Sequence, residues 1–312
     1  MNWRIKASLQ KILAVTKIGD MLNHLPVTFN KKYHQNVFLY QTHECLRKFN
    51  YCNLDLKKEL TALEIGTGYS ILSCVVLSLL GFKKIITVDI TKDIRFATFK
   101  KQIAYIDSPS FLNLMLTKSI FTEDEIKSII CLIKEKKSFS ELFDFLNIVY
   151  IAPYRFDIIE KQSQTFNYIS SQVVLEHIKP EILDELFKKT KEWLTEDGFC
   201  VHTINFIDHF ANPGFFQDKS ISEFNFLKYS DTDWSFWAGN SIAYTNRLSY
   251  LYYLKLCSKF NLTVIDFIGE NYRPRIELKS NKIHEDVLKK YSSDYDINEL
   301  TKFQRGTLII KN

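Results

Sequence analysis

The sequence predicts an α/β fold in which a seven-stranded, mostly parallel sheet carries helices on both faces. From Leu60 onward, short apolar or β-branched segments alternate with segments whose apolar residues recur at helical spacing. This alternation is typical of parallel sheets, because parallel neighbours need a crossover connection that is usually a helix. Polar segments also follow directly after predicted strands, at 64–70, 89–95, 171–177 and 205–210. Parallel sheets bind ligands at this edge.

The predicted strands are short and apolar or rich in β-branched residues. They lie at 61–65, 84–90, 147–153, 167–171, 199–206, 262–269 and 305–311. Helices are predicted at 71–80, 93–104 and 179–194, the last ending near a turn at Thr195-Glu196-Asp197-Gly198.

Three further segments complete the predicted organisation. Residues 1–58 form an N-terminal helical extension to a main domain at 59–312. The mostly helical stretch at 105–147 is longer than a typical connection and is interpreted as an insertion over one sheet edge. Residues 208–260 are loop and helix, dense in aromatic residues.

Composition indicates a soluble globular protein. Of 312 residues, 46% are hydrophobic and 25% charged, and 41 basic residues against 36 acidic ones give a net charge of +5. That excess is mild and forms no dense basic block, so no nucleic-acid partner is expected. The longest apolar run, 71–81, is short of the roughly 20 residues that span a bilayer. With no secretory signal visible, a cytoplasmic location is expected.

The six cysteines are scattered and form no C-x-x-C pair. This favours reduced thiols over disulfides or zinc. Nor do His202, Asp208 and His209 have the spacing of a metal site, so no metal is expected.

Gly66 and Gly68 lie between the first predicted strand and the following helix, and Asp89 ends the second strand. A glycine turn lets a ligand approach the backbone and the helix N-terminus. The acid suits ribose hydroxyls in either a dinucleotide or a smaller nucleoside cofactor. The dinucleotide pattern G-x-G-x-x-G requires a third glycine where this chain has Ile71.

Glu64 precedes these glycines in the arrangement E-x-G-x-G-x-S. The arrangement resembles the first motif of class I S-adenosylmethionine-dependent methyltransferases. The resemblance implies a Rossmann-like domain that binds S-adenosyl-L-methionine. In it, Asp89 lies at the ribose with Ile90 beside it, and the cofactor loop contains Glu64, Gly66, Thr67 and Gly68. Ser70 departs from the family, which usually has a third glycine there.

Later segments strengthen this resemblance. FNYISSQVVLEHI at 166–178 resembles the family's fourth motif, which implies that Ser171 and Gln172 face the cofactor at a strand tip. The phrase LTEDGFCVHTI resembles the family's turn into the fifth strand. After the third strand, Ala152, Tyr154 and Arg155 are candidates for contacting the adenine. Tyr154 either stacks on that ring or packs under the insertion.

Residues 202–248 resemble a bacterial methyltransferase subgroup associated with cell-surface polysaccharide synthesis, which implies a sugar or glycan acceptor. The resemblance rests on Asp208-His209-Phe210, Trp234, Gly239-Asn240 and Asn246-Arg247-Leu248. Asn205 departs from it, since an acid is more usual there.

Methyl transfer from a sulfonium depends chiefly on placing the nucleophile, and a hydroxyl acceptor also benefits from a base. His209 is the first candidate base, with Asp208 beside it, and His177 is the second. The structural alternatives are loop anchoring through the backbone for His209 and a place in the N-terminal turn of a helix for His177.

Two groups of side chains are candidates for contacting the acceptor. Flat apolar surface comes from Trp234, Phe236, Trp237 and Tyr244. Polar groups that orient an acceptor, or else cap helices and form salt bridges, are Asn240, Asn246 and Arg247.

The sequence therefore predicts O-methylation of a small molecule, sugar or glycan. A non-catalytic binding protein with this fold is the main alternative, and a NAD-dependent oxidoreductase is the second. The acceptor and the oligomeric state are left open.

Overall fold

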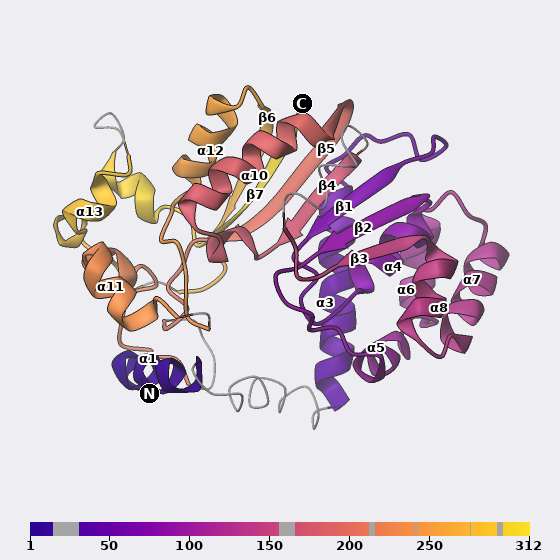
Figure 1. The fold of residues 1–312 in the computed structure, drawn as a ribbon, viewed down its shortest axis with the longest axis horizontal. Coiled ribbons are helices and arrows are strands. Elements are labelled where there is room, and N and C mark those ends of the chain that lie inside the picture. Colours follow the sequence, from indigo (N-terminus) through magenta and orange to yellow (C-terminus); the bar gives the residue numbers. More distant parts are fainter. Residues whose placement is uncertain (15–30, 156–165, 212–215, 241, 275, 292–295) are drawn as a thin grey trace. The chain divides into compact units, whose positions relative to one another are not determined.

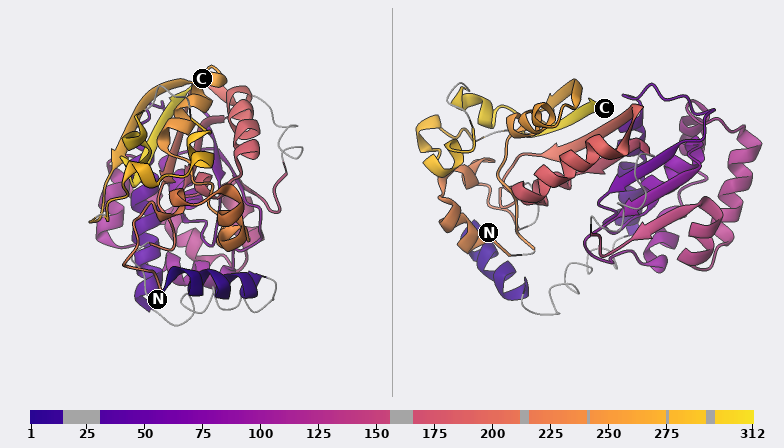
Figure 2. Two further views of the ribbon diagram at one scale, coloured as in Figure 1. Left: turned by 90° about the vertical axis from the view of Figure 1, so that its left-hand side faces the viewer. Right: turned by 45° about the horizontal axis from the view of Figure 1, so that its top comes forward.

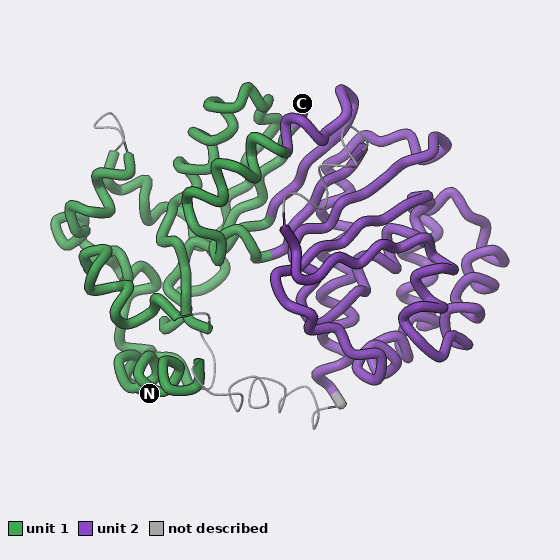
Figure 3. The backbone as a smooth tube through the Cα atoms, in the orientation of Figure 1, with its two compact units in different colours: residues 1–25, 173–189, 203–310 green, residues 26–172, 190–202, 311–312 purple. Residues whose placement is uncertain are grey.

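The computed structural model describes residues 1–14, 31–155, 166–211, 216–240, 242–274, 276–291 and 296–312 (Figure 1). The chain divides into two compact units (Figure 3). Unit 1 comprises Met1–Leu25, Val173–Lys189 and Thr203–Ile310, and unit 2 comprises Pro26–Gln172, Thr190–His202 and Lys311–Asn312.

The seven predicted strands are confirmed, and they form one sheet in the order β3-β2-β1-β4-β5-β7-β6. Their bounds are β1 Thr61–Ile65, β2 Lys84–Val88, β3 Ile148–Ile151, β4 Phe166–Gln172, β5 Leu194–Asn205, β6 Thr263–Glu270 and β7 Arg305–Lys311. β1 pairs in parallel with both β2 and β4, and β2 pairs in parallel with β3. The strand order reverses between β1 and β4, which creates a topological switch point at the carboxyl ends of these two strands.

The start of β5 differs from the prediction. The expected turn at Thr195-Glu196-Asp197-Gly198 is part of the strand, which begins at Leu194. Neighbouring segments hold this extended start: Asn312 donates to the carbonyl of Leu194, and the Asn167 amide to the hydroxyl of Thr195. Hydrogen bonds from distant residues therefore override the local turn signal.

Unit 2 contains six helices among its described residues (Figure 1 and Figure 2). They are α3 Lys31–Phe49, α4 Leu72–Leu80, α5 Phe96–Ile103, α6 Pro109–Leu116, α7 Glu123–Glu135 and α8 Phe139–Leu146. Helix α4 is buried almost all round, as its unbroken apolar sequence requires. The predicted insertion at 105–147 contains α6, α7 and α8, and α8 packs against the edge strand β3.

Unit 1 begins with helix α1, Trp3–Ala14. Trp3 packs against Phe210 and Trp234, with ring centroids 5.6 and 5.9 Å apart, in an apolar core of this unit. The remaining helices are η2 Leu175–His177, α10 Pro180–Trp193, η3 Asn225–Lys228, α11 Asp231–Ala238, α12 Tyr250–Lys259, η4 Ser280–Lys282, α13 Glu285–Leu288 and η5 Ile297–Thr301. The last residues of α10 belong to unit 2.

The helical nature of the N-terminal segment is confirmed for its described residues, but its two helices separate. Helix α1 belongs to unit 1 and α3 to unit 2. Within the described part of the chain, no helix is both long enough and apolar enough to cross a membrane. All six cysteines are free thiols.

Candidate functional site

The loop after β1 is anchored to the end of β2 through backbone hydrogen bonds. The N–H groups of Gly66 and Thr67 donate to the carbonyl oxygen of Val88, at 2.8 and 3.2 Å. Both glycines have positive φ, 85° at Gly66 and 57° at Gly68, a conformation that other residues rarely adopt. The loop therefore needs both glycines in order to turn at the switch point.

Asp89 is bonded directly to this loop. Its Oδ2 accepts a hydrogen bond from the N–H of Gly68 at 2.7 Å, and its Oδ1 accepts one from the N–H of Thr91 at 3.1 Å. The Thr91 hydroxyl also lies 3.4 Å from Oδ1. Oδ2 has a second acceptor position, so Asp89 retains capacity for a further hydroxyl donor. The structure thus brings together the glycine loop and the acid that the sequence predicted as partners.

Apolar and aromatic side chains flank Asp89. Ile90 follows it and is 78% exposed. The N–H of Tyr154 donates to the carbonyl of Asp89 at 2.7 Å, which places this half-buried tyrosine at the same strand end. Ala152 is half-buried and Arg155 is exposed. Of these three residues after β3, the structure gives Tyr154 the direct connection to Asp89.

Ser70 has a structural role where the family usually has glycine. Its hydroxyl donates to Oε1 of Gln102 at 2.9 Å and accepts weakly from the N–H of Leu72 at 3.4 Å. Its φ is not positive, so the position does not require glycine. Ile71 is buried at the start of α4, at the position where the dinucleotide motif has the glycine that allows close packing of helix against strand.

Glu64 is buried and surrounded by compensating groups. The thiol of Cys74 donates to its Oε2 at 3.1 Å. Burial raises the pKa of Glu64, while the charge of Lys48 and hydrogen bonds from Cys74 and Ser73 lower it. Lys48 is itself buried, and its ammonium donates to the carbonyl of Ser171 at 3.1 Å. Glu64 therefore bonds β1 to α4 and is compensated by the charge of Lys48 on α3.

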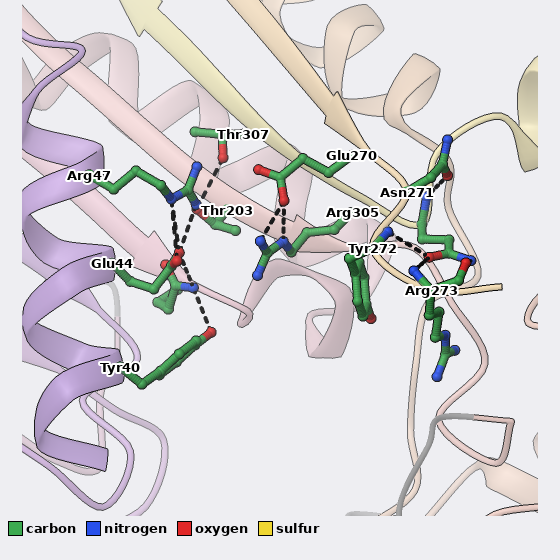
Figure 4. Close-up of polar contacts among 12 residues, drawn as sticks. Tyr40, Glu44, Arg47, Thr203, Glu270, Asn271, Tyr272, Arg273, Arg305 and Thr307 are labelled. Carbon is green, nitrogen blue, oxygen red and sulfur yellow. Dashed lines mark hydrogen bonds and ion pairs between the residues drawn. The ribbon is translucent and has the colours of Figure 1, made fainter. Parts of the chain in front are cut away.

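Ser171 and Gln172 end β4, as predicted, but their side chains have different surroundings. The Ser171 hydroxyl is buried and bonded to Nδ1 of His202 at 2.8 Å. Burial lowers the pKa of His202 to about 3, so that ring is neutral. Gln172 is half-buried, and its Nε2 donates to the Tyr40 hydroxyl at 2.9 Å and to Glu44 at 3.0 Å (Figure 4).

Sequence reasoning missed the contribution of α3 to this end of β4. Tyr40, Glu44 and Arg47 lie on one face of the helix, and Arg47 pairs with Glu44 at 2.7 Å (Figure 4). Their i, i+4, i+7 spacing could have indicated this contribution in the sequence, because residues at that spacing share one face of a helix. The helix that the sequence placed outside the cofactor domain therefore contacts a predicted cofactor residue.

In unit 1, Glu176, His177 and His209 form a cluster. One ligand atom from each lies within 4.8 Å of the other two, and the two imidazole centroids are 5.0 Å apart. Nδ1 of His177 lies 2.8 Å from the carbonyl oxygen of Tyr244. Because a carbonyl oxygen only accepts, Nδ1 carries the hydrogen and Nε2 has the free lone pair.

The histidines of this cluster are neutral. Burial lowers the pKa of His209 to about 3, and the charges of His177 and Lys6 act in the same direction. Burial lowers the pKa of His177 as well, against the opposing effect of its hydrogen bond to the carbonyl of Tyr244, although part of this side chain is open to solvent. A neutral imidazole has one lone pair, which can accept a proton or bind a metal.

Glu176 has no compensating partner of the kind that Glu64 has. It is buried, and neither carboxylate oxygen accepts a hydrogen bond of good geometry from the described residues. Burial raises its pKa to about 8, a rise that the nearby backbone N–H groups of Glu176 and Asn205 oppose. The cluster therefore contains a carboxyl group that is costly to ionise without a cation.

Asp208 does not couple to His209. Its buried carboxylate accepts from the N–H of Phe210 at 2.8 Å and from the Asn225 amide at 3.4 Å. Burial raises the pKa of Asp208 to about 7. These bonds hold the turn that carries His209, so the role of Asp208 is structural. The neighbour of His209 is instead Asn205, whose amide nitrogen lies 3.4 Å from Nε2.

The polar candidates at 240–247 hold loops. The Asn246 amide donates to the carbonyls of Leu175 and Ile178, at 2.7 and 2.9 Å, and its backbone N–H to that of Glu176 at 2.8 Å. Arg247 is buried, donates to two carbonyls of 226–229, and pairs with Asp231. Asn240 accepts two backbone hydrogen bonds within its own turn. Asn246 thus fixes the turn that presents Glu176 and His177.

The aromatic candidates divide between core and surface. Trp234 is in the core of unit 1, and Trp237 packs against that core. Phe236 is exposed, with the Lys11 ammonium 3.8 Å from its ring centroid. Tyr244 is half-buried and presents its carbonyl to His177.

Comparison with known proteins gives fold-level similarities. No protein-family model matches the chain, and no curated protein does. Solved structures that it resembles include a methyltransferase from Mesorhizobium loti described as S-adenosylmethionine dependent (11% identity, 83% of this chain, 94% of that one, TM-score 0.41). Another is phosphoethanolamine N-methyltransferase 2 from Haemonchus contortus in complex with S-adenosyl-L-methionine (14% identity, 86% of this chain, 52% of that one, TM-score 0.42).

Proposed function

We propose that the protein is an S-adenosylmethionine-dependent methyltransferase. The observation that carries this proposal is the bond between Gly68 and Asp89 at the point where the strand order reverses between β1 and β4. A glycine turn, a helix N-terminus and an acid for ribose hydroxyls meet there. The buried Ile71 disfavours a dinucleotide and favours a smaller nucleoside cofactor.

The residues of unit 2 supply complementary groups for such a cofactor. Asp89 accepts a hydrogen bond from a ribose hydroxyl, and Ile90 and Tyr154 offer apolar surface for the adenine. Oε1 of Gln172 is buried and has no hydrogen-bond partner among the described residues. It is a suitable acceptor for the ammonium group of the methionine end. When bound, the cofactor supplies an activated methyl group on a sulfonium.

We assign the acceptor as a hydroxyl of a small molecule, sugar or glycan. In the transfer, the acceptor oxygen bonds to the methyl carbon as the carbon–sulfur bond breaks. The hydroxyl proton goes to the unprotonated ring nitrogen of His209 or His177, both of which are neutral. The likeness of residues 202–248 to enzymes of surface-polysaccharide synthesis supports the glycan class.

The binding experiment is calorimetric titration of the purified protein with S-adenosyl-L-methionine. Asp89→Ala is expected to weaken binding about 10- to 100-fold, the effect of losing hydrogen bonds to a charged group. Asp124→Asn, which changes an exposed carboxylate on α7, is the matched control and should bind as the parent does. Equal affinity in the Asp89 variant would remove the ribose assignment, and tight NADH binding would favour an oxidoreductase.

The reaction is tested by incubating the protein with methyl-labelled cofactor and fractionated cell extract. Transfer of label to a carbohydrate-containing fraction, abolished in His209→Gln, is the expected result. Cofactor binding without transfer to any fraction would instead favour a non-catalytic binding protein.

A further inference from the structure

We propose that Glu176, His177 and His209 form a binding site for a divalent transition-metal ion, and that zinc is the ion best matched to these ligands. The site lies within unit 1. One carboxylate and two imidazoles are a donor set that zinc uses in catalytic sites, where a fourth position is left open. Magnesium and calcium prefer oxygen donors throughout and fit it less well.

The spacing of the ligand atoms is close to that of a bound site. The three atoms lie within 4.8 Å of one another. Ligand atoms about 2 Å from one zinc ion in tetrahedral geometry are about 3.3 Å apart. The gap between these values is of a size that side-chain rotations can close, so the fold needs no rearrangement to coordinate an ion.

The unpartnered carboxylate of Glu176 is the independent observation that points to a cation. Glu176 is only 3% exposed, and no described group donates a well-formed hydrogen bond to either oxygen. Burying a carboxylate without a partner is unfavourable, whereas coordination to a cation compensates its charge. A purely structural role for this residue leaves that cost unexplained.

The two histidines are oriented as metal ligands usually are. Nδ1 of His177 donates to the carbonyl of Tyr244, which directs the lone pair of Nε2 outward. Near His209, Oδ1 of Asn205 has no hydrogen-bond partner among the described residues, while its Nδ2 lies 3.4 Å from Nε2 of His209. Rotating this amide by 180° would let Oδ1 accept from Nε2–H and leave Nδ1 of His209 free to coordinate.

The surroundings set the character of the site. Asn246 holds both ends of the turn at 175–178, so Glu176 and His177 are positioned in advance. His177 is open to solvent, which leaves the fourth coordination position accessible. The ammonium of Lys6 lies 3.4 Å from the carbonyl oxygen of His209. Its charge repels a bound cation, so binding depends on strong nitrogen ligands.

The sequence indicated no metal because the histidines and acids considered there were His202, Asp208 and His209. Asp208 is bonded into its own turn, and His202 is bonded to Ser171 and Cys200 within unit 2. The proposed ligands come from two segments more than 30 residues apart, so their spacing matches no sequence motif.

An ion bound here would lower the pKa of a coordinated hydroxyl. The coordinated hydroxyl would then release its proton to solvent and not to a histidine, because the lone pairs of both rings would bind the ion. This consequence rests on the proposed function, but the metal site itself does not.

The experiment is titration of the full-length, chelator-treated protein with Co²⁺, followed by visible absorption, and then displacement of cobalt by Zn²⁺. One equivalent of cobalt is expected to give d–d bands that zinc abolishes. Glu176→Gln and His177→Gln are each expected to weaken binding roughly 100-fold or more, beyond the effect of losing an outer-shell contact. His43→Gln and Glu196→Gln change exposed residues of unit 2 and are the matched controls.

Absence of a saturable cobalt spectrum in the parent protein would overturn the proposal, as would equal binding by parent and His177→Gln. Because His177 is partly exposed, its variant tests the site even where Glu176→Gln affects folding. S-adenosyl-L-methionine titration of the same samples keeps the two proposals separate. Metal binding without cofactor binding would contradict only the proposed function, and the reverse result would contradict only the metal site.

Discussion

The two units each contain a buried glutamate near a predicted site, and the two glutamates differ in what surrounds them. Glu64 in unit 2 has the charge of Lys48 nearby and a hydrogen bond from Cys74. The carboxylate of Glu176 in unit 1 accepts no well-formed hydrogen bond from the described residues, and it lies close to His177 and His209. A buried charge that the protein itself compensates serves the fold, whereas one left uncompensated indicates a ligand.

Among the variants that test this comparison, Lys48→Met is expected to change the free energy of unfolding most. It leaves Glu64 without its compensating charge, and removing one partner of a buried pair costs about 3–5 kcal/mol. Urea unfolding should show this loss in the free energy of unfolding. Combining it with Glu64→Gln should restore part of the stability, and a double variant no better than Lys48→Met would show that the two side chains do not interact.

The cost of Lys48→Met should also depend on pH. Burial raises the pKa of Glu64, and removing Lys48 raises it further because that charge opposes the shift. The folded variant then binds a proton at a pH where the unfolded chain has lost it, so stability falls as pH rises. Urea unfolding at pH 5 and pH 8 should show the smaller loss at pH 5. An equal loss at both values would mean that Glu64 stays in one protonation state.

Asn246→Ala is expected to have the next largest effect, because Asn246 holds the turn that presents Glu176. Losing its side-chain hydrogen bonds to Leu175 and Ile178 should lower the free energy of unfolding by about 2–3 kcal/mol. Cobalt affinity should fall about 10- to 100-fold, as it does when outer-shell partners of metal ligands are lost. Asn298→Ala changes an exposed asparagine and serves as control. Unchanged cobalt affinity in Asn246→Ala would show that the metal site does not depend on this turn.

The matched pair Glu64→Gln and Glu176→Gln tests the comparison directly. At pH 8 without metal, Glu64→Gln should lower the free energy of unfolding by about 1–3 kcal/mol, because favourable partners are lost. Glu176→Gln should leave it unchanged or raise it by about 1 kcal/mol, because an uncompensated charge is removed. Chemical denaturation measures both. Similar losses of unfolding free energy in the two variants would mean that the Glu176 carboxylate stabilises the fold.

The smallest effect is expected from Ser70→Ala. The variant loses the hydrogen bond to Gln102, which is worth about 1 kcal/mol of unfolding free energy. Cofactor affinity should change less than twofold, since the Ser70 hydroxyl is directed to Gln102 within the protein. A tenfold loss of S-adenosyl-L-methionine affinity would place Ser70 in the cofactor site. Serine at this position would then have a role in cofactor binding.

The sequence by itself determined the seven strands, most of the helices, and the pairing of the glycine loop with Asp89. These follow from local properties: hydrophobic period, β-branched residues, and the backbone freedom of Gly66 and Gly68. The predicted start of β5 was wrong because that prediction also used only local properties. A local turn signal carries no information about the hydrogen bonds that Asn167 and Asn312 supply from elsewhere in the chain.

Only the tertiary structure decided what the site residues contact. The sequence placed Asp208 beside His209 without specifying the contacts of either side chain, and in the structure the turn directs the carboxylate to Phe210 and Asn225. Helix α3 supplies Lys48 to the end of β4, although no motif links them. Glu176 meets His209 because the folded chain brings two distant strand ends together. Side-chain direction and burial arise from packing between distant segments, which residue spacing does not specify.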